Sequence, residues 1–176
     1  MVRPLYCALA LVVGGMTIGA AAEAPLPVVE ALDLNRYVGN WHEIARYPNF
    51  FERMCVRDVT ASYTANPDGT IRVVNACRKA DGTMTQADGV ARMVTPPARL
   101  QVRFAPDWLA WLPGLWGNYW VIELADDYSF AVVGEPGREY LWILARTPQM
   151  SDDVYARILS RLPALGFEPA RLVRNP

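Results

Sequence analysis

Few side chains in this 176-residue chain have the types and spacing that catalysis or metal binding requires. His42 is the only histidine, which excludes a metal site built from several histidines. Lys79 is the only lysine, so a covalent mechanism through a lysine amine has a single candidate. Once Cys55 and Cys77 pair with each other, no Cys/His or Ser/His/Asp arrangement is available. We therefore expect no enzymatic activity, no metal and no cofactor.

The composition is that of one globular domain. Hydrophobic residues make up 52% of the chain and charged residues 20%, which argues against intrinsic disorder. The 17 basic and 18 acidic residues leave a formal net charge of −1, whereas a nucleic-acid-binding protein normally has a basic excess. We expect no nucleic-acid partner.

The first residues have the pattern of a secretory signal peptide. Arg3 precedes an apolar run over residues 5–18, and small alanines follow that run. The pattern predicts a signal peptide over residues 1–22 and a mature domain over residues 23–176. A membrane anchor is the alternative, although the run is short for a membrane span. Cys7 precedes most of the run and does not suit a lipid anchor.

The mature chain consists mainly of short segments with strand character, separated by turn residues. Apolar and polar side chains alternate in several of them, most clearly in Leu100-Gln101-Val102-Arg103-Phe104. Regularly spaced short strands favour a sandwich or a barrel. The expected strands cover residues 40–47, 56–65, 70–78, 85–93, 99–105, 119–124, 129–134 and 140–146.

One helix is predicted near the C-terminus. Ser151 can cap it, and the two aspartates that follow favour the positive N-terminal end of a helix. Tyr155, Ile158, Leu159 and Leu162 form one apolar stripe. We expect this stripe to pack on the outside of the sheet, with docking of a partner as the alternative.

The positions of Cys55 and Cys77 indicate a disulfide. They are equidistant from residue 66, close to the predicted turn Asn66-Pro67-Asp68-Gly69, and facing residues of an antiparallel hairpin are equidistant from its turn. An even number of cysteines in an exported chain also favours pairing. Two free buried thiols are the alternative.

Several motifs, in their order, carry a resemblance to a known family. Gly39-Asn40-Trp41 is followed late in the chain by Asp126-Asp127-Tyr128 and by Arg146. The stretches Arg36 to Trp41 and Tyr140-Leu141-Trp142-Ile143-Leu144 are more specific. Over residues 32–174 the chain resembles the lipocalins, in the branch of bacterial outer-membrane lipocalins and apolipoprotein D. It departs from that branch at His42, where a tyrosine is usual.

The resemblance implies an all-β fold, an eight-stranded antiparallel up-and-down barrel with the C-terminal α-helix packed outside. An eight-stranded barrel is wide enough to hold one small ligand. Trp41 and Arg146 would stack and seal the barrel floor. The connections at 66–69, 94–98 and 126–128 would lie at the floor, and those at 48–55, 79–84, 105–118 and 135–139 at the open mouth.

Alternation, with its parity set by the resemblance, predicts the residues that line the ligand cavity. Tyrosine hydroxyls and Asn75 could bind a polar head group, and small residues such as Ala61 favour open space. The alternative is that the side chains fill the barrel completely. The predicted lining is Ala61, Tyr63, Val73, Asn75, Leu100, Val102, Phe104, Tyr119, Val121, Tyr140 and Trp142.

Two further features inside and beside the expected barrel have alternative interpretations. Glu43 shares the inward parity of Trp41, so it is either a floor group paired with a nearby arginine or an acid with a shifted pKa. The connection 105–118 is rich in tryptophan and has one charged residue. It could pack on the barrel, cap the cavity or touch a membrane through Trp108, Trp111 and Trp116.

The leading hypothesis is non-enzymatic binding, storage or transport of a fatty acid, lysophospholipid or similar lipid in the bacterial cell envelope. The resemblance suggests membrane maintenance under stress as the setting. A haem or pigment binder that uses His42 as axial ligand, or an enzyme with this fold, is the alternative. We expect an exported periplasmic protein, monomeric or homodimeric, with peripheral contact with the outer membrane left open.

Overall fold

The computed structural model describes residues 25–109, 112 and 114–176. The predicted signal peptide with Cys7, and Trp111 in the long connection, lie outside the described residues.

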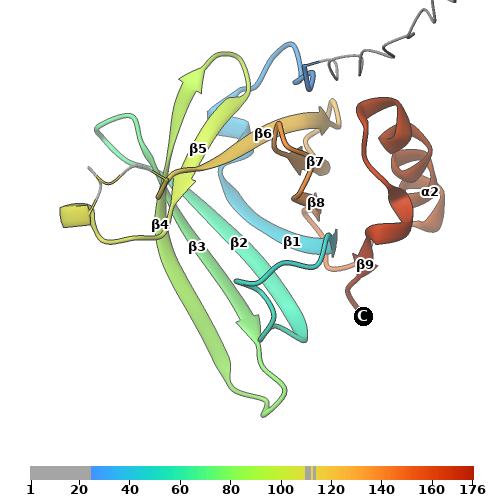
Figure 1. Cartoon of the computed structure of the whole chain (residues 1–176), viewed down its shortest axis with the longest axis horizontal. Helices are drawn as coiled ribbons and strands as arrows, with labels where there is room; N and C mark the ends of the chain where they lie inside the picture. The colour runs from blue at the N-terminus through green and yellow to red at the C-terminus, as the bar shows by residue number, and fades with distance from the viewer. Residues whose placement is uncertain (1–24, 110–111, 113) are drawn as a thin grey trace, which may run out of the picture.

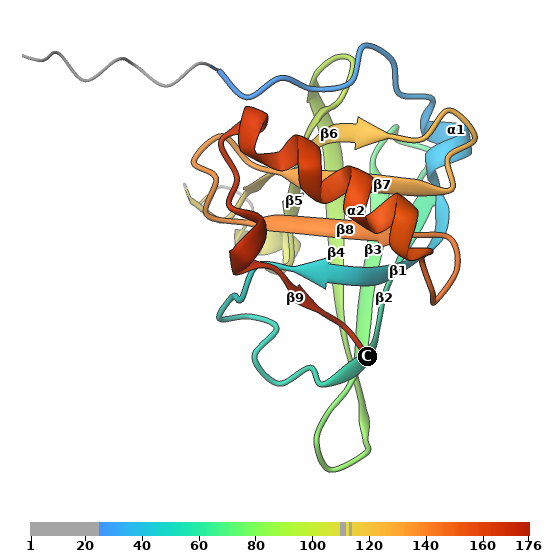
Figure 2. The ribbon, with the colours of Figure 1, turned by 90° about the vertical axis from the view of Figure 1, so that its right-hand side faces the viewer.

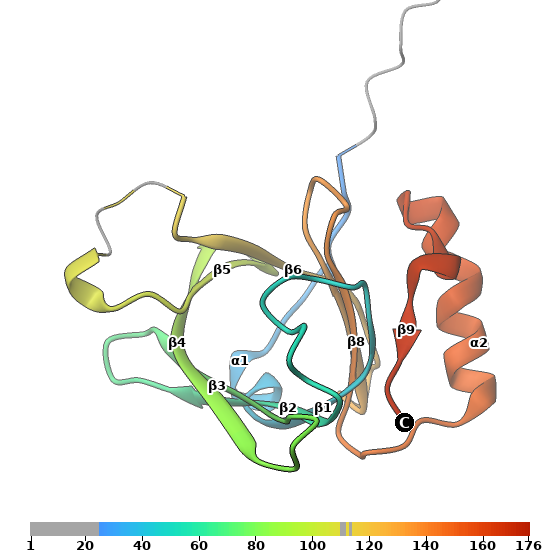
Figure 3. The ribbon, with the colours of Figure 1, turned by 60° about the horizontal axis from the view of Figure 1, so that its bottom comes forward.

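The described chain forms a closed antiparallel barrel (Figures 1 and 3). Consecutive strands are hydrogen-bonded neighbours, and the first strand pairs with both the second and the eighth, which closes the ring. The eight-stranded barrel expected from alternation and resemblance is confirmed. Its strands are β1 (Gly39–Arg46), β2 (Arg57–Ala65), β3 (Ile71–Arg78), β4 (Met84–Thr95), β5 (Arg99–Arg103), β6 (Gly117–Leu124), β7 (Phe130–Gly134) and β8 (Leu141–Ala145).

Two short elements of the barrel had no clear signal in the sequence. Helix α1 (Leu34–Tyr37) is a single turn capped by the side chain of Asp33, and it lies inside the ring of strands when the barrel is seen along its axis (Figure 3). Strand β9 (Val173–Arg174) pairs with β1 at Ala45 and Arg46. A single turn and a two-residue strand are too short to show helical or alternating periodicity.

Helix α2 (Asp152–Arg161) covers one outer face of the barrel (Figure 2). The Ser151 side chain accepts a hydrogen bond from the Val154 amide, as the sequence predicted. Ile158 and Leu162 have no exposed surface because they pack against the outward side chains of β7 and β8. The helix therefore belongs to the fold, as expected. Short 3₁₀ turns flank these elements at Asp107–Leu109, Leu162–Leu165 and Pro169–Arg171.

Alternation along the strands separates two apolar cores. One lies inside the barrel and contains Trp41, Tyr63 and Leu100. The other lies between the barrel wall and α2 and contains Ile143 and Ile158. The first core determines what the barrel can hold. No helix in the described ranges is long and apolar enough to cross a membrane.

The disulfide between Cys55 and Cys77 is present, but the hairpin register expected for it is wrong. Ala61 faces Asn75, so the β2–β3 hairpin is centred on residue 68 instead of residue 66. Cys55 therefore lies in the connection before β2, and the disulfide joins that connection to β3 with a Cα–Cα distance of 5.5 Å.

Candidate functional site

The barrel floor is closed by Trp41 and Arg146. The guanidinium carbon of Arg146 lies 3.8 Å from the centroid of the Trp41 ring. The guanidinium also donates to the carbonyls of Arg36, Tyr37 and Asn40, and the Trp41 indole donates to the Tyr37 carbonyl. These contacts join α1 to β1 and β8 and leave the opposite end of the barrel as the way in.

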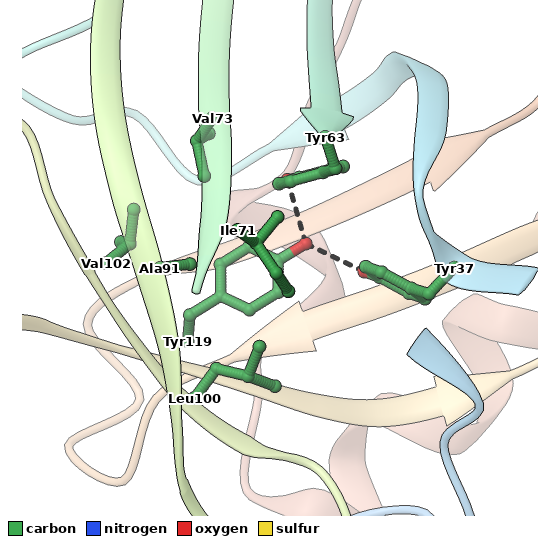
Figure 4. A pocket seen from close by; sticks show the side chains of 8 residues that line it. All are labelled: Tyr37, Tyr63, Ile71, Val73, Ala91, Leu100, Val102 and Tyr119. Carbon is green, nitrogen blue, oxygen red and sulfur yellow. Dashed lines mark hydrogen bonds between the residues drawn. The ribbon is translucent and has the colours of Figure 1, made fainter. Parts of the chain in front are cut away.

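Above this floor lies a small, mostly apolar pocket (Figure 4). Its volume is about 10 Å³, which is room for about one water molecule. Aliphatic side chains and three tyrosine rings surround it. The lining residues are Tyr37, Tyr63, Ile71, Val73, Ala91, Leu100, Val102 and Tyr119.

Three tyrosine hydroxyls meet in this pocket. The Tyr119 hydroxyl oxygen lies 2.7 Å from that of Tyr37 and 3.0 Å from that of Tyr63 (Figure 4). Burial raises the pKa of all three hydroxyls, in the case of Tyr63 to about 12. All three are therefore protonated at neutral pH and available as hydrogen-bond donors. We call these residues the tyrosine triad.

Five of the eleven predicted lining residues line this pocket: Tyr63, Val73, Leu100, Val102 and Tyr119. The other six lie elsewhere in the barrel. Ala61 and Val121 are buried in the same inner core. Asn75 is partly buried, and its side-chain oxygen has no hydrogen-bond partner. Phe104, Tyr140 and Trp142 lie nearer the open end, with Phe104 and Tyr140 exposed.

Sequence reasoning missed three lining residues. Ile71 has the inward parity of Val73, so alternation could have identified it. Ala91 lies in β4, where small side chains such as Ala87 and Gly89 give only a weak apolar signal on the inward face. Tyr37 comes from α1, which is too short for any periodic signal.

An aromatic cluster lines the wall near the open end. Tyr140 and Trp142 are stacked with ring centroids 5.9 Å apart, and Phe51 lies 5.5 Å from Tyr140. A Cβ atom at Gly89 would approach the Phe104 ring to 2.7 Å, so the glycine makes room for that ring. Large aromatic surfaces therefore face the route into the barrel.

Charged side chains form a second cluster in the same half of the barrel. Arg46 lies 2.9 Å from a Glu43 oxygen, and its Nε lies 3.0 Å from Glu52 in an ion pair without hydrogen-bond geometry. Asn175 donates to Glu43, and the Trp142 indole donates to Glu52. Burial, reinforced by the negative charge of Glu52, raises the pKa of Glu43 to about 8. Glu43 thus has both an arginine partner and a shifted pKa, but it belongs to the cluster with Glu52 toward the open end and not to the floor.

The tryptophans of the long β5–β6 connection have different surroundings. Trp116 lies against the barrel wall between Arg92 and Arg103, whose guanidinium carbons are 4.0 and 5.1 Å from the ring centroid. Trp108 is 73% exposed. Of the two tryptophans of this connection that the structure describes, only Trp108 is therefore free to meet a ligand or a surface.

Exposed apolar side chains concentrate at the open end. They come from the β1–β2 connection, the beginning of β4, the chain after β5 and the chain before β8. We call them the apolar rim: Phe50, Phe51, Met54, Val56, Met84, Phe104, Trp108 and Tyr140.

His42 and the acidic residues do not assemble a metal site. His42 lies between Trp41 and Glu43 on β1, and adjacent side chains on a strand point to opposite faces, so it faces away from the inner core. Within the described ranges, no three His, Cys, Asp or Glu side chains lie close enough to bind a metal together.

Comparisons with known proteins give the same picture as the geometry. The family model described as "Lipocalin-like domain" matches residues 32–176. Temperature-induced lipocalin-1 of Arabidopsis thaliana is 37% identical over 155 residues, which are 86% of this chain and 82% of that protein. Outer membrane lipoprotein Blc of Escherichia coli (strain K12) is 35% identical over 159 residues, 87% of this chain and 86% of that protein.

A solved structure shares the fold at much lower identity. Insecticyanin from Manduca sexta superposes with a TM-score of 0.66 at 18% identity, covering 90% of this chain and 86% of that one.

Proposed function

The chain belongs to the lipocalin family, and from this premise we propose that it binds, stores or transports a small hydrophobic ligand without altering it chemically. The observation that carries the proposal is the inner face of the barrel. It is closed at Trp41 and Arg146, apolar around the pocket, and surrounded at its open end by the apolar rim.

An acyl chain is the ligand that this surface suits best. Each CH₂ group moved from water into the barrel contributes about 0.8 kcal/mol. The pocket is nearly filled, so a long ligand must displace inner side chains. Val102 is only partly buried and is the lining residue best placed to move. Fatty acids, lysophospholipids and similar lipids are the candidate ligands.

The cell envelope is the proposed location. One relative is named an outer membrane lipoprotein, and the Cys55–Cys77 disulfide suits an oxidising compartment such as the periplasm. The name of one relative, temperature-induced lipocalin-1, supports a role under stress, and we propose membrane maintenance as that role. Exposed aromatic side chains on the apolar rim suit a transient contact with a lipid surface during ligand exchange.

No catalytic step is proposed. The acidic side chains Glu43 and Glu52 are held by Arg46, Asn175 and Trp142. His42 faces away from the inner core, which does not favour haem ligation.

Native mass spectrometry of the protein purified from its own cells, with extraction of bound lipid, tests the proposal. We expect a mass increment that matches an acyl lipid, and quenching of tryptophan fluorescence when a lysophospholipid is added to delipidated protein. A protein that is always empty and shows no quenching would contradict ligand binding.

A further inference from the structure

The tyrosine triad has more hydrogen-bonding capacity than it uses. Three hydroxyl protons are present, and the contacts of Tyr119 with Tyr37 and Tyr63 use two of them. No other hydrogen bond to these hydroxyls occurs within the residues that the structure describes. One donor and several oxygen lone pairs therefore remain.

A partner for the remaining hydroxyl proton and lone pairs has to come from a molecule inside the pocket. The other five lining side chains are aliphatic and offer neither a donor nor an acceptor. A buried donor without a partner is costly, so the pocket favours an oxygen atom at its deep end. The space there is about 10 Å³, enough for a single oxygen-bearing group and too small for a bulky one.

The electrostatics indicate that this group is neutral. None of the eight side chains that line the pocket is cationic, so an anion there would have no opposite charge beside it. The floor cation Arg146 is already engaged with Trp41 and four backbone carbonyls. A carboxylate or phosphate would lose its hydration there without gaining a free cation.

We infer that the tyrosine triad is a recognition site for a neutral hydroxyl or carbonyl oxygen at the buried end of the ligand. The preferred ligand is thus an apolar molecule that carries an alcohol, ketone or aldehyde at the end that enters first. This inference rests on the proposed ligand binding and adds the chemical class of the buried end.

Two ligands that differ by one hydroxyl group test this recognition site. Dodecanoate and 12-hydroxydodecanoate share the carboxylate that stays at the mouth, and only the second brings a hydroxyl to the pocket. Their dissociation constants are measured by displacement of N-phenyl-1-naphthylamine from the wild type, from Tyr119→Phe and from the triple variant with phenylalanine at the three triad positions. Tyr155→Phe, outside the barrel on α2, is the matched control.

In the triple variant, we expect the affinity for 12-hydroxydodecanoate relative to that for dodecanoate to fall by about tenfold. Binding of dodecanoate itself should stay within about twofold, because the phenylalanine rings keep the apolar wall. The ratio in Tyr155→Phe should equal that of the wild type. Tyr119→Phe removes the shared partner of the Tyr37 and Tyr63 hydroxyls and frees both donors, so it should shift the ratio in favour of the hydroxylated ligand, and it provides the readout if the triple variant does not fold.

An unchanged ratio in both variants, with the probe still displaced, would overturn the recognition site and leave the proposed function standing. If neither the probe nor either ligand binds the wild type, the proposed function fails and the inference fails with it.

Discussion

Arg146 lies over the ring of Trp41, with its guanidinium carbon 3.8 Å from the ring centroid, and the same guanidinium donates to four backbone carbonyls. One side chain from the end of β8 thereby fixes the beginning of β1 and the end of α1. The floor of the barrel depends on this contact.

Replacing Arg146 with methionine should destabilise the protein by about 2–4 kcal/mol, because the cation–π contact is lost and carbonyls at the floor lose their donors. Urea unfolding followed by tryptophan fluorescence measures the change. Arg157→Met, at an exposed position on α2, is the control and should change stability by less than about 0.5 kcal/mol. Equal stabilities of the two variants would contradict the importance of the floor contact.

Gly39→Ala should also loosen the floor. Gly39 has φ +103°, and an added Cβ would lie 3.2 Å from the Arg146 guanidinium. We expect a cost of about 1–3 kcal/mol from the strained backbone and the close contact. Gly69→Ala separates the two causes, because Gly69 has φ +83° but open space around it. In thermal or urea unfolding, Gly69→Ala should lower the stability by less than Gly39→Ala does. An equal or larger loss in Gly69→Ala would argue against crowding at Gly39.

Stability should fall as pH rises through the range in which Glu43 ionises. Its pKa is raised to about 8 in the folded protein from an ordinary value of 4.5, so folding favours the protonated form. The stabilisation is complete below about pH 4.5 and is lost progressively up to about pH 8, with a slope of at most about 1.4 kcal/mol per pH unit.

Urea unfolding at a series of pH values tests this expectation. Glu43→Gln should flatten the dependence, whereas Glu30→Gln, at an exposed position, should leave it unchanged. The role of Glu43 would be contradicted if the stability of the wild type rose between pH 5 and 8. It would also be contradicted if Glu43→Gln had the same pH dependence of stability as the wild type.

Two tryptophans of the β5–β6 connection should respond differently to mutation. Trp108→Ser should weaken co-sedimentation with phosphatidylethanolamine/phosphatidylglycerol vesicles, because the exposed ring belongs to the apolar rim. Trp116→Ser should leave vesicle binding unchanged and lower stability by about 1–3 kcal/mol, because Arg92 and Arg103 lose the ring between them. Vesicle binding that is insensitive to Trp108→Ser would argue against lipid contact at this position.

Much of the barrel could be predicted from local patterns. The strands and the α2 stripe occur close to their expected positions, because alternation and helical periodicity are properties of a few consecutive residues. The hairpin register was misplaced by two residues, because Asn66 pairs with Thr70 across the turn and moves its centre to residue 68.

The charged cluster shows why alternation was insufficient for the interior. An irregularity in the pairing of β1 with β8 falls between Glu43 and Ala45. Beyond it the inward parity changes, so Arg46 faces the interior together with Glu43. Strict alternation would have placed Arg46 on the outer face.

The sequence by itself determined the eight strands of the barrel and the outer helix through local patterns. It determined the stacked pair Trp41 and Arg146 through a family motif, and the disulfide partners through an even number of cysteines in the predicted exported chain. Only the tertiary structure decided which polar groups meet inside the barrel. The tyrosine triad combines α1, β2 and β6, and its members become neighbours only through closure of the ring and the register of its strands. The hydrogen-bonding character of the deep end is therefore a property of the closed barrel and of no single segment.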